Sequence, residues 1–83
     1  MKAHVYVTLK QTVLDPQGQA IHGALRKMQY QGIEDVRQGK YFVLKLSDSL
    51  DASAAKAEVE RIAREVLTNP VIEEFTFHLE DAD

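Results

Sequence analysis

The sequence contains no cysteine. This absence excludes a disulfide scaffold, a thiolate metal site and a cysteine nucleophile, and it fits a reducing compartment, so we expect a cytoplasmic protein. No apolar run approaches the roughly 20 residues that span a bilayer. The amino-terminal stretch MKAHVYVTLK alternates in polarity and has no apolar block of signal-peptide length. We therefore expect neither a membrane partner nor a targeting segment.

Basic residues are fewer than acidic ones, and the net charge is −3. Affinity for phosphate backbones comes mainly from clustered Lys and Arg, so the charge argues against a nucleic-acid partner. The composition, 45% hydrophobic and 28% charged, is ordinary for a globular protein. We expect residues 1–83 to form a single domain. A chain this short buries only about 60–65% of its unfolded surface, so association with other chains would stabilise it.

The first half of the chain predicts a strand, a helix and a second strand. Residues 3–10 alternate between apolar and polar side chains, the period of a half-buried strand. Asp15 suits the N-cap of a helix and Pro16 its first position. Apolar residues then recur on one helical face, and Gly32 predicts the C-cap. This face contains Ala20, Ile21, Ala24, Leu25 and Met28.

The second half predicts a hairpin, a helix and a last strand. Residues 33–38 read as a short polar strand, Gly39-Lys40 as the tip of a hairpin, and residues 41–46 as its second arm. A helix follows over residues 52–68, and Asn69-Pro70 ends it. Its core stripe is predicted at Ala55, Val59, Ile62 and Val66. Residues 71–79 are predicted to form the last strand, with Val71, Phe75, Phe77 and Leu79 inward and Glu73 on the same side near an end of the strand. Residues 80–83 read as a frayed acidic tail.

The order β-α-β-β-α-β predicts an α+β fold, a ferredoxin-like sandwich with a four-stranded antiparallel sheet and both helices on one face. The other sheet face would then carry a mixed apolar and aromatic surface that favours a partner. Its members would be His4, Tyr6, Thr8, Tyr41, Val43, Ile72, Thr76 and His78. Among these we predict that Tyr6, Tyr41 and Val43 form a contact between copies of the chain.

The sequence offers no clear catalytic, cofactor-binding or metal-binding residue. Its serines (Ser47, Ser49 and Ser53) stand where they would cap the second helix. His4 and His78 could meet across the sheet, but two histidines without a third ligand make a poor zinc site. The stretch QGQAIHG lacks the Lys and Ser/Thr of a phosphate loop. An RNA-recognition motif would need aromatics where Lys40 and Lys45 stand.

Three stretches taken together resemble a known family. They are VLDPQGQAIHGAL (13–25), GIEDVRQGKYFVLKL (32–46) and NPVIEEF (69–75), and they resemble the PurS subunit of bacterial and archaeal phosphoribosylformylglycinamidine synthase (formylglycinamide ribonucleotide amidotransferase). The likeness spans nearly the whole chain in the family's order. Two departures are Met28-Gln29, where Leu-Gly would be expected, and Phe42-Val43, where the family often has a more acidic pair.

This resemblance implies a place in purine biosynthesis. The complex is a glutamine-dependent, ATP-consuming C–N ligase (EC 6.3.5.3) in which a glutaminase subunit, PurQ, releases ammonia and a synthetase subunit, PurL, uses ATP and Mg²⁺. The resemblance implies that PurS carries no catalytic residue or cofactor, bridges the two larger subunits and supports ammonia transfer. It also implies a homodimer or homotetramer.

The same resemblance makes the sharp corners of the chain candidates for contact with the larger subunits. The candidate residues are Asp15, Gln17, Gly18, Arg37, Gly39 and Lys40. Each also has a purely structural interpretation, as a helix cap or a hairpin tip, and the sequence does not choose between them. The alternative function on the same predicted fold is a small-molecule-sensing regulatory module of the ACT type.

Overall fold

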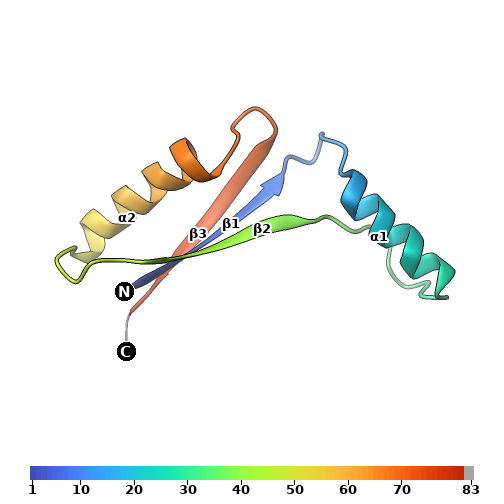
Figure 1. Ribbon diagram of the computed structural model, residues 1–83, viewed down its shortest axis with the longest axis horizontal. Coiled ribbons are helices and arrows are strands. Elements are labelled where there is room, and N and C mark those ends of the chain that lie inside the picture. Colours follow the sequence, from blue (N-terminus) through green and yellow to red (C-terminus); the bar gives the residue numbers. More distant parts are fainter. Residues whose placement is uncertain (82–83) are drawn as a thin grey trace.

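The structure, a computed structural model, describes residues 1–81. The elements are β1 (Lys2–Leu9), α1 (Pro16–Lys27), β2 (Gly39–Lys45), α2 (Ala52–Ile62), the π-helical turn η1 (Ala63–Leu67) and β3 (Glu73–Glu80). The strands form one antiparallel sheet in the order β2-β1-β3 (Figure 1). Over the residues that the structure describes, the fold is therefore α+β with a three-stranded sheet, and the prediction of four strands is wrong. Glu80 belongs to β3 and not to a tail, and residues 82–83 of the predicted tail lie outside the described residues.

The core lies between the central strand β1 and the helix α2. Ala3, Val5 and Val7 of β1 are fully buried, as the alternation predicted, and Val59 and Ala63 pack in the same cluster from the other side. Half-buried apolar side chains of β2 and β3 surround this cluster, among them Phe42, Leu44, Phe75, Phe77 and Leu79. Within residues 1–81, α2 is the only helix that packs on the sheet, so one face of the sheet is covered and the other is open (Figure 1).

The inward stripe of the second helix changes register at its end. Ala55 and Val59 are buried as predicted, but Val66 is 73% exposed. Ala63 is buried in the core cluster and Leu67 packs against it instead. The cause is η1, because a π-helical turn bonds residues five apart and rotates the residues that follow it. Val71 also differs from its prediction, since it precedes β3 and is exposed.

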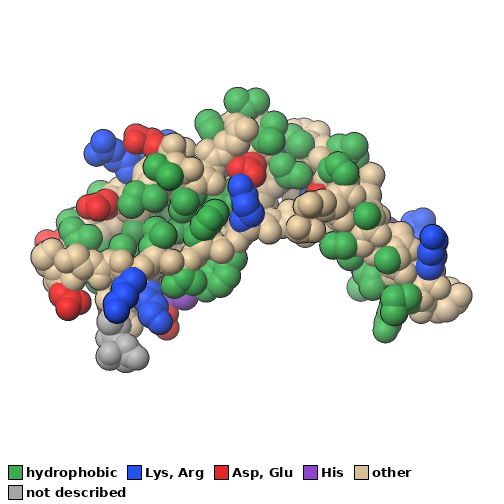
Figure 2. Space-filling view, viewed as in Figure 1, with side chains coloured by type: hydrophobic (Ala, Val, Ile, Leu, Met, Phe, Trp, Pro, Cys, Tyr) green, Lys and Arg blue, Asp and Glu red, His purple; other side chains and the backbone are tan. Residues whose placement is uncertain are grey.

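Helix α1 projects away from the rest of the molecule (Figure 1). Of its residues only Gly18 is buried, so the prediction that both helices cover one sheet face is wrong for α1. The radius of gyration is 16.4 Å, compared with about 12 Å for a compact domain of this length. The molecule measures 51 × 31 × 14 Å, and hydrophobic side chains lie on the surface of the projecting part (Figure 2).

The projection follows from the absence of the predicted hairpin. Gly39 and Lys40 begin β2, where they pair with Thr8 and Val7, and residues 33–38 form no strand. Tight hairpin turns require a positive φ, and none of the glycines within residues 1–81 has one. The left-handed residue is Gln29 (φ 73°), which follows the C-cap of α1 at Met28, so the predicted cap at Gly32 is also wrong.

Replacing Gly39 by Ala should destabilise the fold by about 1–3 kcal/mol in urea unfolding. A Cβ at this position would lie 2.5 Å from the carbonyl oxygen of Val7, too close for the strands to keep their spacing. The control is Gly23→Ala in α1, where a Cβ has nothing within 4 Å. This control should gain about 0.5–1 kcal/mol from reduced backbone entropy. Equal stability of Gly39→Ala and the wild type would contradict the close approach.

Candidate functional site

The predicted partner-contact residues gather at one place, although the two groups, 15–18 and 37–40, lie far apart in the sequence. We call this place the corner and define it by Asp15, Gln17, Gly18, Arg37, Gly39 and Lys40. Here the start of α1 meets the start of β2 beside a hollow of about 190 Å³. Asp15, Gln17, Gly39 and Lys40 line this hollow, together with Val7, Leu9, Gln38 and Glu73.

Asp15 holds the corner together and is only 3% exposed. Its carboxylate caps α1, as predicted, by accepting the N–H of Gly18 at 2.9 Å. The second oxygen accepts the N–H of Gln38 at 2.7 Å, which ties the segment before β2 to the start of α1. These bonds, first from Gln38 and then from Gly18, lower the pKa of Asp15, and the nearby Arg37 guanidinium adds to the effect. Asp15 is therefore an ionised structural link.

The stability of the fold should depend on Asp15 in acid. A carboxyl group whose pKa is lowered on folding stabilises the fold at any pH well above the ordinary pKa, which is 3.8 for Asp. This contribution is lost as the pH falls through the lowered pKa of the folded state. Asn at position 15 has one acceptor oxygen, so one of the two N–H groups loses its partner. We expect Asp15→Asn to melt roughly 5–10 °C lower than the wild type at pH 7. On acidification, the melting temperature of this variant should fall by less than that of the wild type.

The measurement is the melting temperature between pH 2.5 and 7. The matched control is Asp51→Asn, since Asp51 caps α2 with a single bond to the N–H of Ala54. The melting temperature of that variant should fall with pH almost as steeply as that of the wild type, because Asp15 is unchanged and Glu73 and Glu80 also have lowered pKa values. If the melting temperature of Asp15→Asn falls with pH as steeply as that of the wild type, Asp15 is not the ionised link proposed here.

Arg37 and Gly18 are also part of the internal framework. One nitrogen, Nη2 of Arg37, donates to the carbonyl oxygens of Lys10 and Val13, both at 2.9 Å. A Cβ on Gly18 would lie 2.2 Å from the carbonyl oxygen of Val36, so only glycine allows this approach. These contacts fix the direction in which α1 leaves the sheet.

Gln17, Gly39 and Lys40 are the exposed members of the corner, and of these Gln17 and Lys40 have polar side chains. Lys40 forms an ion pair of 3.3 Å with Glu73 across the hollow. Glu73 was not among the predicted contact residues, although its predicted inward position on the last strand was a usable signal. Glu73 also accepts the N–H of Asn69, and this bond, followed by Lys40, lowers its pKa. The Asn69-Pro70 corner is thereby joined to the same site.

The second candidate surface is the sheet face opposite α2, which we call the open face. Tyr6, Tyr41 and Val43 lie on it as predicted, with exposures of 40%, 54% and 51%. The rings of Tyr6 and Tyr41 stack at 5.1 Å, and those of His4 and His78 at 4.7 Å. The open face is therefore a continuous row of rings.

Polar bonds fix this row at one end. Nδ1 of His4 lies 2.6 Å from the Tyr41 hydroxyl, and Nε2 lies 2.7 Å from a carboxylate oxygen of Glu80. The bond to His4 lowers the pKa of Glu80. The rings are thus held in place before any partner arrives.

Neither surface resembles a metal centre. Within residues 1–81, no group of three or more His, Cys, Asp or Glu side chains is placed to hold a metal ion. In the same part of the chain, no helix has the length and apolar character needed to cross a membrane. The polar groups of the corner bind backbone atoms and one another, and this arrangement fixes the backbone conformation there.

Comparisons with known proteins agree with one another. Residues 2–81 match the family model described as PurS: Phosphoribosylformylglycinamidine (FGAM) synthase. A PurS subunit from Mycobacterium leprae is 49% identical over 75 residues, which cover 90% of this chain and 90% of the relative. The Bacillus subtilis PurS structure superposes with a TM-score of 0.81 at 40% identity, covering 96% of this chain and 98% of that one. A chain in the structure of PurLQS from Thermotoga maritima gives 0.79 at 28% identity, covering 93% of each.

Proposed function

The chain belongs to the PurS family, and from this premise we propose that it bridges the glutaminase and the ATP-dependent synthetase of its complex and supports ammonia transfer between them. PurS is a subunit of phosphoribosylformylglycinamidine synthase, a ligase (EC 6.3.5.3) of purine biosynthesis. The proposed partners are PurL and PurQ, because a chain of similar fold occurs in the PurLQS structure. The chain contributes no catalytic residue in this proposal.

The observation that carries the proposal is the rigid corner. Asp15, Gly18 and Arg37 fix the backbone around it, and Gly39 keeps β2 close to β1. Gln17 and Lys40 then stand exposed at the edge of a hollow that is large enough for one side chain of a partner. A preformed surface of this kind binds with little loss of conformational entropy. We propose Gln17 and Lys40 as the direct contacts and the other four residues as their support.

The open face supports a second part of the proposal, a contact between two copies of the chain through Tyr6, Tyr41 and Val43. Aromatic side chains that are already stacked lose little entropy on association and bury a large apolar area. The resulting assembly is a homodimer, or a homotetramer if the copies also associate through a second contact.

The remaining parts of the proposal concern the whole complex. ATP and Mg²⁺ are used by the synthetase subunit, and this chain binds neither. We further propose that residues 1–83 act as one PurS domain and that the complex works in the cytoplasm, and a role in purine biosynthesis supports this location.

The test is physical association. The purified chain, mixed with its own synthetase and glutaminase and with glutamine and ATP, should elute as one species that contains all three proteins. Gln17→Arg should weaken this species without changing the melting temperature. The control is Ser49→Arg, because Ser49 is exposed and lies beyond the other end of β2. Separate elution at micromolar concentration, together with calorimetric binding of a free amino acid or nucleotide, would favour the sensor alternative.

A further inference from the structure

We propose that His4 and His78 make self-association through the open face depend on pH. Two copies bind while both imidazole rings are neutral, and protonation of these rings in weak acid separates the copies. This inference rests on the open-face contact of the proposed function and adds the groups that control it. It does not involve the corner or the contacts with PurL and PurQ.

Both ring nitrogens of His4 are bonded within the chain. Nε2 lies 2.7 Å from a carboxylate oxygen of Glu80, and Nδ1 lies 2.6 Å from the Tyr41 hydroxyl. The bond to His4 lowers the pKa of Glu80, so the carboxylate is ionised and can only accept a hydrogen. Nε2 therefore carries the hydrogen of the neutral ring, and Nδ1 accepts the hydrogen of the Tyr41 hydroxyl. In this state both hydrogens are used within the chain.

Protonation of His4 reverses one of these bonds. The added hydrogen lies on Nδ1, so this nitrogen must donate to the oxygen of Tyr41. The Tyr41 hydroxyl must then turn its own hydrogen away from His4, toward the surface that a second copy covers. Tyr41 is 54% exposed and stacks on Tyr6 at 5.1 Å, so the change occurs within the proposed contact. A hydroxyl hydrogen covered there without an acceptor is costly, which disfavours the protonated ring in the associated state.

His78 adds a second site for a proton. Its ring stacks on that of His4 with the centroids 4.7 Å apart, and on that of Tyr6 at 5.9 Å. Two imidazolium rings at 4.7 Å repel each other, and the single carboxylate of Glu80 balances only one of them. A covering copy would also remove the water that screens these charges. Association therefore favours the neutral form of both rings.

The charges of the open face balance only while the histidines are neutral. By the strand register and the alternation of side chains, two lysines and two glutamates lie on this face. They are Lys2, Lys45, Glu74 and Glu80. Protonation of His4 and His78 gives the face an excess of positive charge, to which the amino group of Met1 adds beside Lys2. Because the contact joins identical faces, the same excess lies on both copies and opposes their association.

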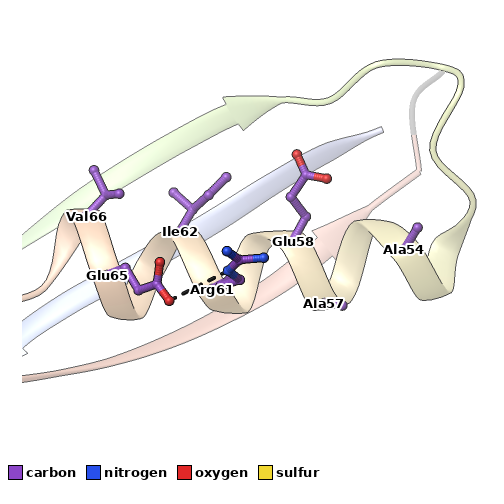
Figure 3. A pocket seen from close by; sticks show the side chains of 7 residues that line it. All are labelled: Ala54, Ala57, Glu58, Arg61, Ile62, Glu65 and Val66. Atoms are coloured by element: carbon purple, nitrogen blue, oxygen red, sulfur yellow. Dashed lines mark ion pairs between the residues drawn. The ribbon is translucent and has the colours of Figure 1, made fainter.

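Other surfaces of the chain do not share this response. The remaining histidine, His22, lies on α1, where its Nε2 is 2.9 Å from the carbonyl oxygen of Ile33. A hollow along α2 and η1 has Glu58, Arg61 and Glu65 as its charged side chains. Arg61 is paired there with Glu65 at 3.6 Å (Figure 3). Carboxylates and guanidinium groups keep their charges between about pH 5.5 and 7.5, so weak acid leaves the charge of this hollow unchanged.

The expected effect follows from proton linkage. Histidine side chains titrate near about pH 6.5 in the absence of special interactions. The free chain then binds protons that the associated chain excludes, so association weakens as the pH falls. At one pH unit below that value, one excluded proton per copy weakens association about 10-fold, and the two copies together give about 100-fold.

The test is the dissociation constant of the open-face contact at pH 7.5, 6.5 and 5.5, measured by sedimentation equilibrium at constant ionic strength. The open-face step is the one that Tyr41→Asp weakens at pH 7.5. The wild-type constant should rise at least about 100-fold between pH 7.5 and 5.5. In the double variant His4→Gln, His78→Gln, the amides cannot take up a proton, so the constant should change by less than about 3-fold. The matched control, His22→Gln, should respond to pH like the wild type.

A second measurement needs no variant. The associated wild type is diluted in a calorimeter at pH 6.5, in two buffers that differ in ionisation enthalpy. The difference between the two heats gives the number of protons exchanged, and the separating chains should take up protons. Absence of proton uptake would overturn the inference even if the double variant fails to fold.

The outcomes distinguish this inference from the proposed function. A wild-type constant that is the same at all three pH values, or a pH response that persists in the double variant, would overturn the inference and leave the open-face contact standing. Loss of the response in His22→Gln would assign it to α1 and overturn the inference as well. If Tyr41→Asp associates like the wild type at pH 7.5, the open-face contact fails and the inference fails with it.

Discussion

Omitting this chain from a mixture of its glutaminase and synthetase should lower glutamine-dependent amidation of formylglycinamide ribonucleotide by at least about 100-fold. Ammonia released in water at neutral pH is protonated and diluted, so it reaches the second active site poorly unless the two enzymes are held together around a dry path. Amidation with a high concentration of ammonium salt should remain, because the synthetase keeps its own chemistry. The measurement is product formation with each nitrogen source, with and without the chain.

Point variants make the same assay specific to the corner. Gln17→Arg should raise the concentration of chain needed for half-maximal activity and leave the plateau unchanged, since the variant weakens docking without altering either enzyme. Ser49→Arg should titrate like the wild type. Full glutamine-dependent activity in the absence of the chain would refute its role in the complex, and a normal titration by Gln17→Arg would remove this residue from the contact.

Replacing Tyr41 by Asp should weaken self-association through the open face by at least about 100-fold in dissociation constant. Tyr41 is 54% exposed in the single chain and stacks on Tyr6 at 5.1 Å, so a second copy would cover both rings. Aspartate removes the ring and places an unpaired carboxylate in the contact, where its desolvation is costly. Sedimentation velocity across a concentration series should show the shift to smaller species.

Two further variants isolate the cause. Ser53→Asp adds the same charge on α2, on the covered side of the sheet, and should associate like the wild type. Tyr41→Phe keeps the ring but loses the 2.6 Å contact with His4, and should fall between the wild type and Tyr41→Asp. If Tyr41→Asp self-associates as tightly as the wild type, the open face is not an interface between copies.

Local signals predicted those parts of the fold that depend on neighbours in sequence. The alternation of residues 3–10 identified β1 and its buried side, and Asp15-Pro16 marked the start of α1. The two sides of β1, β2 and β3 were also predicted correctly, so that His4 does lie opposite His78, but Val71 and Ile72, predicted on the inward and the open face, precede β3. These features follow from periodicity and capping, which act over a few residues.

The position of α1 was not predictable in this way. Gly39-Lys40 has the composition of a turn, but the bond from the N–H of Gln38 to Asp15 joins residues 23 positions apart and holds the chain extended there. No periodic signal reports such a bond. The same extension removed the predicted strand at residues 33–38 and left α1 beside solvent.

The corner residues were proposed from a resemblance and from turn chemistry, and the structure brings them to one place for a different reason. Asp15 and Arg37 converge because each binds backbone of the other's segment, and Gly39 lies beside them as a strand residue. Their contact with a partner stays a prediction. Glu73 was missed because a carboxylate with inward parity was read as a strand end.

The position of β1 in the middle of the sheet affects how the chain is made. Every ladder bond of the sheet involves this first strand, and its pairing with β3 joins Lys2 to Glu80. The sheet therefore stays incomplete on the ribosome until β3 has been translated, and until then one edge of β1 has no strand beside it. Such distant pairing slows folding and exposes the nascent chain to aggregation, so chaperone demand should be high for a polypeptide of this size.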